Sequence, residues 1–124
     1  MVERGDDDKS PRQHLQLQLK RFHYIIVRSD LPRGLQSAQI IHAAGESAKL
    51  TSELPTGTHA VALQSDNEDT LTELSKAIDA SGIPYTKITE NDAPYTGQLM
   101  ALGIAPIPRS KELKKLLGKV KLLR

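Results

Sequence analysis

Short apolar runs separated by longer amphipathic segments make up most of the sequence from Phe22 onward. The first run, Tyr24-Ile-Ile-Val27, lies within a predicted strand over Phe22–Arg28 and contains no polar residue. An unbroken apolar run is typical of a central strand that is covered on both faces. The same reasoning predicts strands over His59–Leu63, Pro84–Thr89 and Leu99–Ala105, the last ended by Pro106 and Pro108, and a short edge strand over Val120–Leu123.

The segments between these strands predict three helices. The first covers about Leu35–Lys49, after a turn marked by Pro32 and Gly34, and its many small residues allow close packing on a sheet. We expect one face of this helix to carry its apolar contacts, namely Leu35, Ala38, Ile41, Gly45 and Ala48. A loop is expected at Leu54-Pro-Thr-Gly57.

The other two helices have clear start and stop signals. A polar cluster, Ser65–Thr70, precedes a helix over about Glu68–Ala80, and Gly82 is its expected C-cap. Ser110 is the expected N-cap of a helix over Lys111–Leu117. The acids of the first cluster resemble a carboxylate site, but helix capping explains them better: Asp66, Glu68 and Asp69.

The order of these elements predicts an α/β fold, specifically a three-layer α/β/α sandwich with a mixed four- to five-stranded sheet. Crossover helices make the first three strands candidates for parallel pairing. The shorter loop over Glu90–Gln98 permits an antiparallel neighbour for the fourth strand. Gly103 suits a strand position where another backbone approaches closely.

The chain of 124 residues fits one domain. Residues 1–18 are expected to form a flexible tail, and Gly5-Asp-Asp-Asp-Lys9 resembles an engineered protease-cleavage linker. We therefore expect the folded domain to cover residues 19–124.

Composition excludes several classes of protein. There is no cysteine, so disulfides, cysteine-ligated zinc and thiol catalysis are excluded, and a reducing compartment is favoured. No apolar run approaches the roughly 20 residues that a bilayer span needs, and the N-terminus lacks a signal-peptide pattern. We expect a soluble, cytoplasmic protein without a membrane partner. His14, His23 and His59 lack ligand spacing, so neither a metal site nor another cofactor is expected.

Charge is distributed unevenly along the chain. From Arg109 to the end there are seven Lys and Arg residues against one acid, a net charge of +6, whereas the remaining residues carry −4. A basic end of this kind suggests a polyanionic partner such as RNA, or an acidic protein. It is equally consistent with a solvated helix whose cations favour its C-terminus.

Three motifs resemble the type-2 peptidyl-tRNA hydrolase family: Val27-Arg-Ser-Asp-Leu31, Ala38-Gln-x-x-His-Ala43 and Leu102-Gly-Ile-Ala-Pro106. The resemblance extends from about Phe22 to Leu123, with the motifs in the family's order. It implies the three-layer fold, tRNA as partner, a possible homodimer, and hydrolysis of the ester that joins a peptide to the ribose of tRNA.

The chain departs from the family pattern in two places. The position of the family's turn lysine falls on Leu35, and Arg33 is the nearby cation, which binds anions but does not carry protons. The family's loop aspartate is matched by Glu90, and its loop threonines are matched loosely by Thr96. A divergent branch, the peptidyl-tRNA hydrolase domain-containing proteins, also lacks the lysine and has a short loop with Glu, and this chain is more similar to that branch.

Ester hydrolysis requires a group that activates water, a group that stabilises the oxyanion and groups that hold the tRNA phosphates. Glu90 is the candidate base or water-orienting residue, and Thr96 or backbone N–H groups of the turn are candidates for the oxyanion. His42 and Asp30 complete the candidate catalytic set. The candidate RNA-binding residues are Arg28, Arg33, Gln39, Lys87, Lys111 and Lys114.

Purely structural roles remain open for two of the candidates. His42 is either a base or a hydrogen-bonded structural residue, and Asp30 with Arg28 is either a site pair or an ion pair that stabilises the turn. Two function classes also remain open. The chain is either a hydrolase of peptidyl-tRNA or aminoacyl-tRNA, or a catalytically inactive relative that binds RNA or a protein through the same cleft.

Overall fold

A computed structural model describes residues 20–52 and 57–124. The predicted tail over 1–18 and most of the loop Leu54–Gly57 lie outside the described residues. The strands are β1 (Arg21–Arg28), β2 (His59–Ser65), β3 (Tyr85–Thr89), β4 (Leu99–Ile104), β5 (Ile107–Pro108) and β6 (Lys121–Leu122). The helices are α2 (Arg33–Ala48), α3 (Glu68–Ser81) and α4 (Lys111–Leu117).

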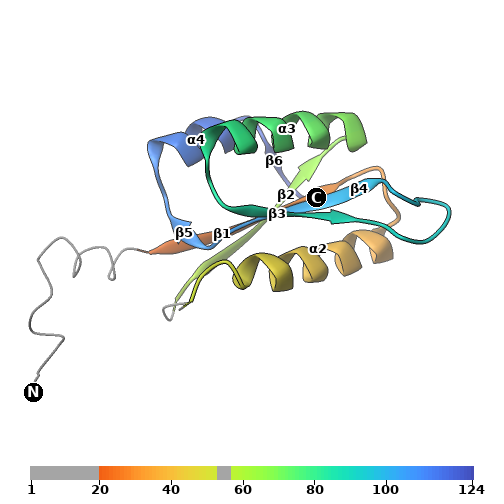
Figure 1. The fold of residues 1–124 in the computed structure, drawn as a ribbon, viewed down its shortest axis with the longest axis horizontal. Helices are drawn as coiled ribbons and strands as arrows, with labels where there is room; N and C mark the ends of the chain where they lie inside the picture. Colours follow the sequence, from red (N-terminus) through yellow and green to blue (C-terminus); the bar gives the residue numbers. More distant parts are fainter. Residues whose placement is uncertain (1–19, 53–56) are drawn as a thin grey trace, which may run out of the picture.

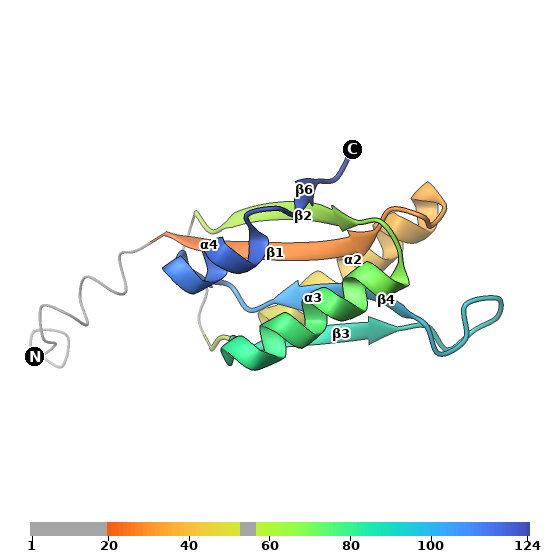
Figure 2. The same ribbon diagram turned by 90° about the horizontal axis from the view of Figure 1, so that it is seen from above.

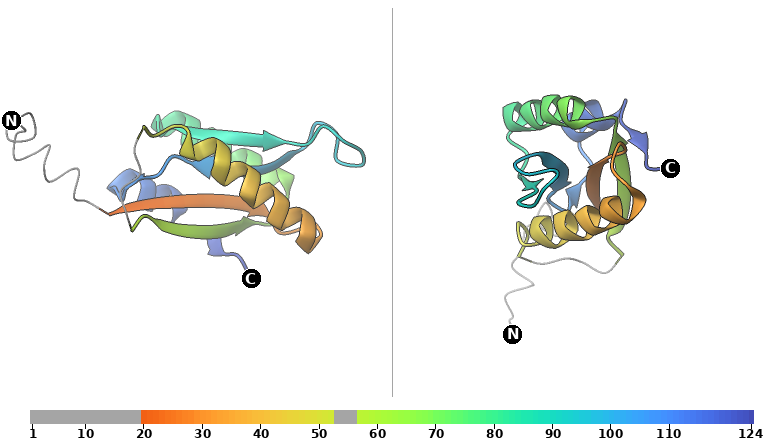
Figure 3. Two further views of the ribbon diagram at one scale, coloured as in Figure 1. Left: turned by 90° about the horizontal axis from the view of Figure 1, so that it is seen from below. Right: turned by 90° about the vertical axis from the view of Figure 1, so that its right-hand side faces the viewer.

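These elements form the predicted three layers, with α3 and α4 on one face of a mixed sheet and α2 on the other (Figure 1). The end-on view separates the layers, and the view from below shows α2 crossing the sheet (Figure 3). The sheet has six strands rather than four or five: β6 is the edge strand expected over Val120–Leu123, and the additional strand is the two-residue β5.

The strand order is β3-β4-β1-β2-β6, with β5 also pairing β1 (Figure 2). β1 and β2 are parallel, as expected, and β4 is antiparallel to both β1 and β3. The expectation that β3 pairs in parallel with its predecessors was wrong. β3 points the same way as β1, but β4 lies between them, because its short loop returns the chain directly beside β3.

The fourth strand is interrupted rather than ended by proline. After Ile104 the chain leaves the ladder at Ala105 and Pro106, and it resumes as β5 opposite the first residues of β1. Pro108 is tolerated in β5 because this pairing lies at the edge of the sheet, where a missing N–H donor is not needed.

Alternation along β1 divides the core into two clusters. Tyr24 and Ile26 face α3 and α4, whereas Ile25 and Val27 face α2. All four are buried, which confirms β1 as a central strand covered on both sides.

The helix ends follow their sequence signals. Asn67 caps α3 by accepting the Thr70 N–H, and Gly82 closes it in the left-handed conformation with φ 77°. Ser110 caps α4 by accepting the Leu113 N–H.

Apart from Leu35, the predicted inward face of α2 was wrong. Its buried residues are Gln39, Ala43 and Ser47, which repeat every four positions, whereas Ile41 is 73% exposed. Small side chains on the true inner face bring the helix backbone onto β4 at Gly103, where an added Cβ would lie 2.5 Å from the Ala43 carbonyl oxygen. The expected close approach at Gly103 is therefore confirmed.

Candidate active site

The carboxyl ends of β1, β2 and β3 lie at one end of the sheet, together with the start of α2 and the loop 90–98 (Figure 1). Open α/β sheets keep their sites at this end, because the polar groups of several loops meet there. The geometry of the individual side chains shows which of the candidates meet.

Arg28 ends β1 and ties two loops together. Its buried guanidinium forms a bidentate pair with Asp30, with Nε 2.9 Å from Oδ1 and Nη2 3.0 Å from Oδ2. Nη1 donates to Gln98 Oε1 at 2.8 Å and to the Leu99 carbonyl at 3.2 Å. The hydrogen bonds to Asp30 raise the pKa of Arg28, so this cation is permanent. Arg28 and Asp30 thus fix the loops rather than project into solvent.

Glu90 directly follows β3 and is fixed by its backbone and its side chain. Its N–H donates to the Gln98 carbonyl at 3.0 Å, and its carbonyl accepts the Gly97 N–H at 2.7 Å. The carboxylate Oε1 accepts the Asn91 N–H at 2.9 Å, and Oε2 accepts Gln39 Nε2 at 3.3 Å. The carboxylate therefore lies half-buried against α2, with lone pairs left on both oxygens.

Gln39 reaches Glu90 because α2 packs closely on the sheet. The amide lies on the buried face of the helix, where a polar group needs a partner, and the Glu90 carboxylate supplies it. The two residues are 51 positions apart in sequence. Their contact therefore joins the first helix to the end of the third strand.

The turn between β1 and α2 is shaped by another amide. Gln36 Nε2 donates to the carbonyls of Leu31 at 2.7 Å and Ser29 at 3.2 Å. Arg33 is the first residue of α2 and is exposed, and no side chain caps this helix. Leu35 packs against the cluster on the α2 face of the sheet, so an apolar side chain fills the position of the family's turn lysine.

Three other candidates form no contact with Glu90. Thr96 is exposed in the loop 90–98, and His42 is exposed on the outer side of α2. Lys87 is exposed on the edge strand β3, three residues before Glu90 and so on the opposite face of the sheet. Within the described ranges, none of the three side chains forms a hydrogen bond, and their catalytic or RNA-binding roles stay predictions.

Lys111 and Lys114 are remote from Glu90. They lie on α4, which follows β5 and covers the opposite end of the sheet (Figure 1). β5 pairs with Arg21 and Phe22 at the start of β1, whereas Glu90 lies near its end. Seven residue steps of β1 separate these ends by roughly 23 Å at about 3.3 Å per residue.

The segments that follow β1, β2 and β3 carry more acids than cations, although Lys119 and Lys121 lie beside the second of them. Segments 28–33, 65–70 and 87–98 contain three cations and six acids, a net charge of −3. Much of this charge belongs to the start of α3, where Glu68 also accepts the Leu99 N–H at 2.7 Å. The cations of the first and third segments that could meet RNA are the exposed Arg33 and Lys87.

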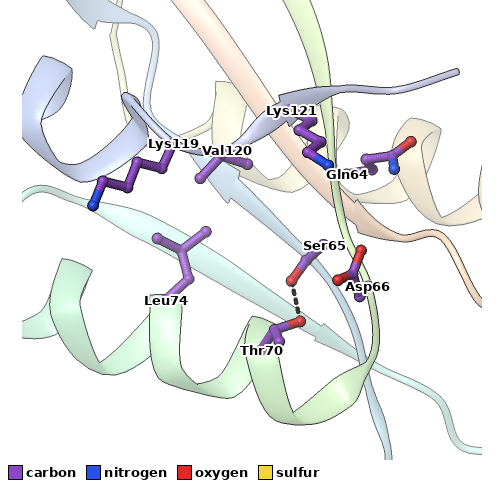
Figure 4. A pocket seen from close by; sticks show the side chains of 8 residues that line it. All are labelled: Gln64, Ser65, Asp66, Thr70, Leu74, Lys119, Val120 and Lys121. Atoms are coloured by element: carbon purple, nitrogen blue, oxygen red, sulfur yellow. Dashed lines mark hydrogen bonds between the residues drawn. The ribbon is translucent and has the colours of Figure 1, made fainter.

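A cavity of about 230 Å³ lies between β2, α3 and β6 (Figure 4). Lys119 and Lys121 lie at one side of it, and the Ser65 and Thr70 hydroxyls face each other at 2.5 Å on the other side. β1 and β4 separate this cavity from Glu90 in the sheet order. It therefore lies beside segment 65–70 and away from Glu90.

Neither a metal cluster nor a membrane helix occurs among residues 20–52 and 57–124. No group of three or more His, Cys, Asp or Glu side chains there is placed to hold a metal ion. The helices of the same ranges are too short or too polar to cross a bilayer.

Sequence reasoning missed two polar side chains that shape the site. Gln98 accepts a hydrogen bond from Arg28, and Gln36 fixes the β1–α2 turn. Gln98 lies in the irregular loop 90–98, where no periodicity marks a polar residue as structural. Gln36 lies in the first turn of α2, where a polar side chain can form hydrogen bonds with the carbonyl groups of the preceding turn. Its position was therefore the signal that could have identified it.

Comparison with known proteins places these features in a family. The family model for the peptidyl-tRNA hydrolase PTH2 matches residues 22–123. A solved structure of a protein of unknown function from Agrobacterium tumefaciens is similar in fold, with a TM-score of 0.66 and 13% identity over 85% of this chain and 98% of that chain. No curated protein matches the sequence. Because the family match covers all but the first residue of the strands and helices described above, this chain belongs to the PTH2 family of peptidyl-tRNA hydrolases.

Proposed function

We propose that this protein hydrolyses the ester bond of peptidyl-tRNA and releases free tRNA and the peptide. The observation that carries the proposal is the Glu90 carboxylate, held by Gln39 and the Asn91 N–H at the carboxyl end of the sheet. The membership of this chain in the PTH2 family supports the choice of peptidyl-tRNA as substrate. Because that substrate arises in translation, we place the activity in the cytoplasm.

In the proposed reaction, a water molecule attacks the carbonyl carbon of the ester while Glu90 accepts its proton. The tetrahedral intermediate then collapses, the bond between the carbonyl carbon and the ribose oxygen breaks, and the ribose oxygen takes up a proton. Positioned carboxylates contribute about 10²–10⁴-fold to such steps. The contact with Gln39 would hold the carboxylate in one orientation while leaving lone pairs free for water.

The remaining roles follow from position. The Thr96 hydroxyl and the first N–H groups of α2 are the candidates for stabilising the oxyanion, because both lie at the same end of the sheet as Glu90. Arg33 is an exposed cation at the start of α2, whose first turn contains no acid, and it would receive a phosphate of the substrate. We assign Asp30 a positioning role through Arg28.

A second candidate function is supported by Leu35 and by the charge of the site. Leu35 packs against the apolar cluster under α2 where the resemblance to the family led us to expect a lysine, and the segments that follow β1, β2 and β3 together carry −3. Under this alternative the chain is a catalytically inactive relative that binds RNA or a protein through the same surface. The two functions differ in a single measurable property, the release of peptide from tRNA.

The decisive experiment measures peptide release from purified peptidyl-tRNA, with free tRNA as competitor. Glu90→Gln keeps the size of the side chain and removes the charge, so kcat should fall by about 100-fold or more with little change in KM. Glu73→Gln is the matched control, because Glu73 is an exposed glutamate of α3 that pairs only with Lys76. Circular dichroism of both variants checks that the fold is retained.

Each outcome separates the alternatives. Cleavage by the wild type that is lost in Glu90→Gln and kept in Glu73→Gln supports the proposed mechanism. Cleavage that survives Glu90→Gln keeps the reaction but removes Glu90 as the base. A wild type that binds tRNA without cleaving peptidyl-tRNA or aminoacyl-tRNA is the inactive relative. The homodimer implied by the resemblance stays a prediction, to be measured by light scattering.

A further inference from the structure

A stack of planar side chains lies at the end of the sheet opposite Glu90. Phe22 is stacked between Tyr24, with ring centroids 6.1 Å apart, and His59, with centroids 5.1 Å apart. Phe22 and His59 are register partners on β1 and β2, so their side chains share one face of the sheet. The Arg109 guanidinium lies 4.5 Å from the centroid of the Phe22 ring. Two of the four Phe and Tyr residues of the chain thus gather at one point.

The stack is closed at one end and open at the other. Tyr24 is buried, and its hydroxyl accepts Arg109 Nη2 at 3.4 Å. Phe22 is half-buried, whereas His59 and Arg109 are exposed. Planar groups that serve only to fill a core would be enclosed on all sides. Here the imidazole of His59 and the guanidinium of Arg109 are exposed to solvent and accessible to another molecule.

Cations lie beside the Tyr24 and Phe22 part of the stack. Lys111, Lys114 and Lys115 are exposed on α4, and their spacing places them on adjoining sides of the helix, away from its buried residues. Lys114 and Arg109 line a cavity of about 220 Å³ beneath α4. The single acid of this helix is Glu112. We call the surface formed by His59, Phe22, Arg109, Lys111 and Lys114 the basic aromatic face.

We infer that the basic aromatic face binds a single-stranded segment of RNA. Bases would stack on the exposed planes of His59 and Arg109, and the α4 lysines would bind the backbone phosphates. Cations interleaved with planar side chains are the pattern by which proteins hold single strands, since every base has a stacking face and every linkage a charge. The inference concerns binding alone and stands whether or not Glu90 catalyses hydrolysis.

Two other partners fit this face less well. A membrane surface would call for exposed apolar side chains beside the cations, but the large hydrophobic residues exposed in the described ranges, Ile41, Leu50 and Leu122, are not part of this face. An acidic protein would use the lysines but would not require the stacked imidazole and guanidinium. The combination of charge and planar groups favours RNA.

The test measures fluorescence anisotropy of a labelled oligouridylate of about twelve nucleotides over a series of salt concentrations. Contacts with about three phosphates predict a slope of log K against log salt of about −2. In Lys114→Gln the slope should become shallower by about 0.7. Lys76→Gln is the matched control, an exposed lysine on α3 whose loss should leave binding unchanged.

Stacking is separated from charge by two further variants. His59→Ala removes a planar face, and Arg109→Lys keeps the charge while removing the planar guanidinium. Each should weaken binding by about 5-fold or more, with the salt slope unchanged. His59 is exposed, so its replacement leaves the core intact, and thermal unfolding of each variant verifies the fold.

The outcomes are decisive. Loss of affinity in His59→Ala and Arg109→Lys, with a shallower slope in Lys114→Gln, supports the inference. A wild type that does not bind the oligonucleotide, variants that bind as well as the wild type, or tighter binding to phosphatidylserine vesicles would each overturn it. Peptide release from peptidyl-tRNA, measured on the same preparation, reports separately on the proposed hydrolysis.

Discussion

Replacing Gly103 by alanine tests the contact that places α2 on the sheet. Gly103 lies in β4 directly under the helix, and the Cβ of an alanine there would lie 2.5 Å from the Ala43 carbonyl oxygen, 2.6 Å from Ser47 Oγ and 2.9 Å from Ser47 Cβ. Ordinary contacts of a Cβ begin at 3.4 Å. The nearest atom belongs to the backbone of α2, so a rotamer change cannot relieve the clash, and the helix must move by about 0.9 Å.

This clash should lower the free energy of unfolding of Gly103→Ala. Overpacking a core by one methyl group costs about 1–3 kcal/mol, and a clash with backbone belongs at the upper end, about 3 kcal/mol. With an unfolding entropy of about 2.1 cal/mol/K per residue over roughly 105 residues, this loss lowers Tm by roughly 14 °C. The Ser47 hydroxyl adds to the cost, because it also donates to the Ala43 carbonyl and bonds with His23 Nε2, each at 2.6 Å.

Urea denaturation followed by far-UV circular dichroism measures the free energy of unfolding. Gly45→Ala is the matched control, because Gly45 lies on α2 with nothing within 4 Å of its potential Cβ. This control should gain up to about 1 kcal/mol from helix propensity. A Gly103→Ala protein within about 0.5 kcal/mol of the wild type would refute the reasoning. If Glu90 is the base, Gly103→Ala should also slow peptide release by more than its folded fraction explains, since α2 carries Gln39.

Two further predictions concern buried polar groups. Arg28→Lys cannot reproduce the bidentate contact with Asp30 together with the bond to Gln98, so the free energy of unfolding should fall by about 2 kcal/mol in urea denaturation, whereas Lys76→Arg on the surface should change nothing. Burial lowers the pKa of His23 below its usual 6.5 in the folded protein. As pH falls below about 6.5, the unfolded chain therefore binds a proton at His23 before the folded protein does. The free energy of unfolding decreases over this range until the folded protein is also protonated. His23→Gln, which keeps a donor for the Ser47 hydroxyl, should therefore lose less Tm than the wild type between about pH 7.5 and about pH 5.5, and an equal loss in both proteins would contradict this account.

The sequence predicted the elements well where the local signal was strong. The unbroken apolar run in β1, the Ser110 cap of α4 and the Gly82 C-cap of α3 each depend on neighbouring residues only, and each was confirmed. The position of Gly103 was also recoverable, because a glycine within an apolar strand has few purposes other than close packing.

The inner face of α2 could not be predicted in the same way. Small residues occupy both sides of this helix, so its apolar pattern is weak, and Ile41 was assigned to the core although it is 73% exposed. The true inner face carries the polar Gln39, whose burial is tolerated only because Glu90 arrives from another strand. The residues of α2 alone do not indicate this hydrogen bond between Gln39 and Glu90.

The sequence by itself determined the α/β class, the order of the strands and helices apart from β5, and the candidate residues Arg28, Gln39 and Glu90, because capping, periodicity and motifs are local properties. Only the tertiary structure decided that β4 lies between β3 and β1, and that Gln39 meets Glu90. It also decided that the lysines of α4 join a stack of planar side chains far from Glu90. These outcomes depend on which distant segments bury one another's surfaces, and that choice is made by the packing of the whole chain.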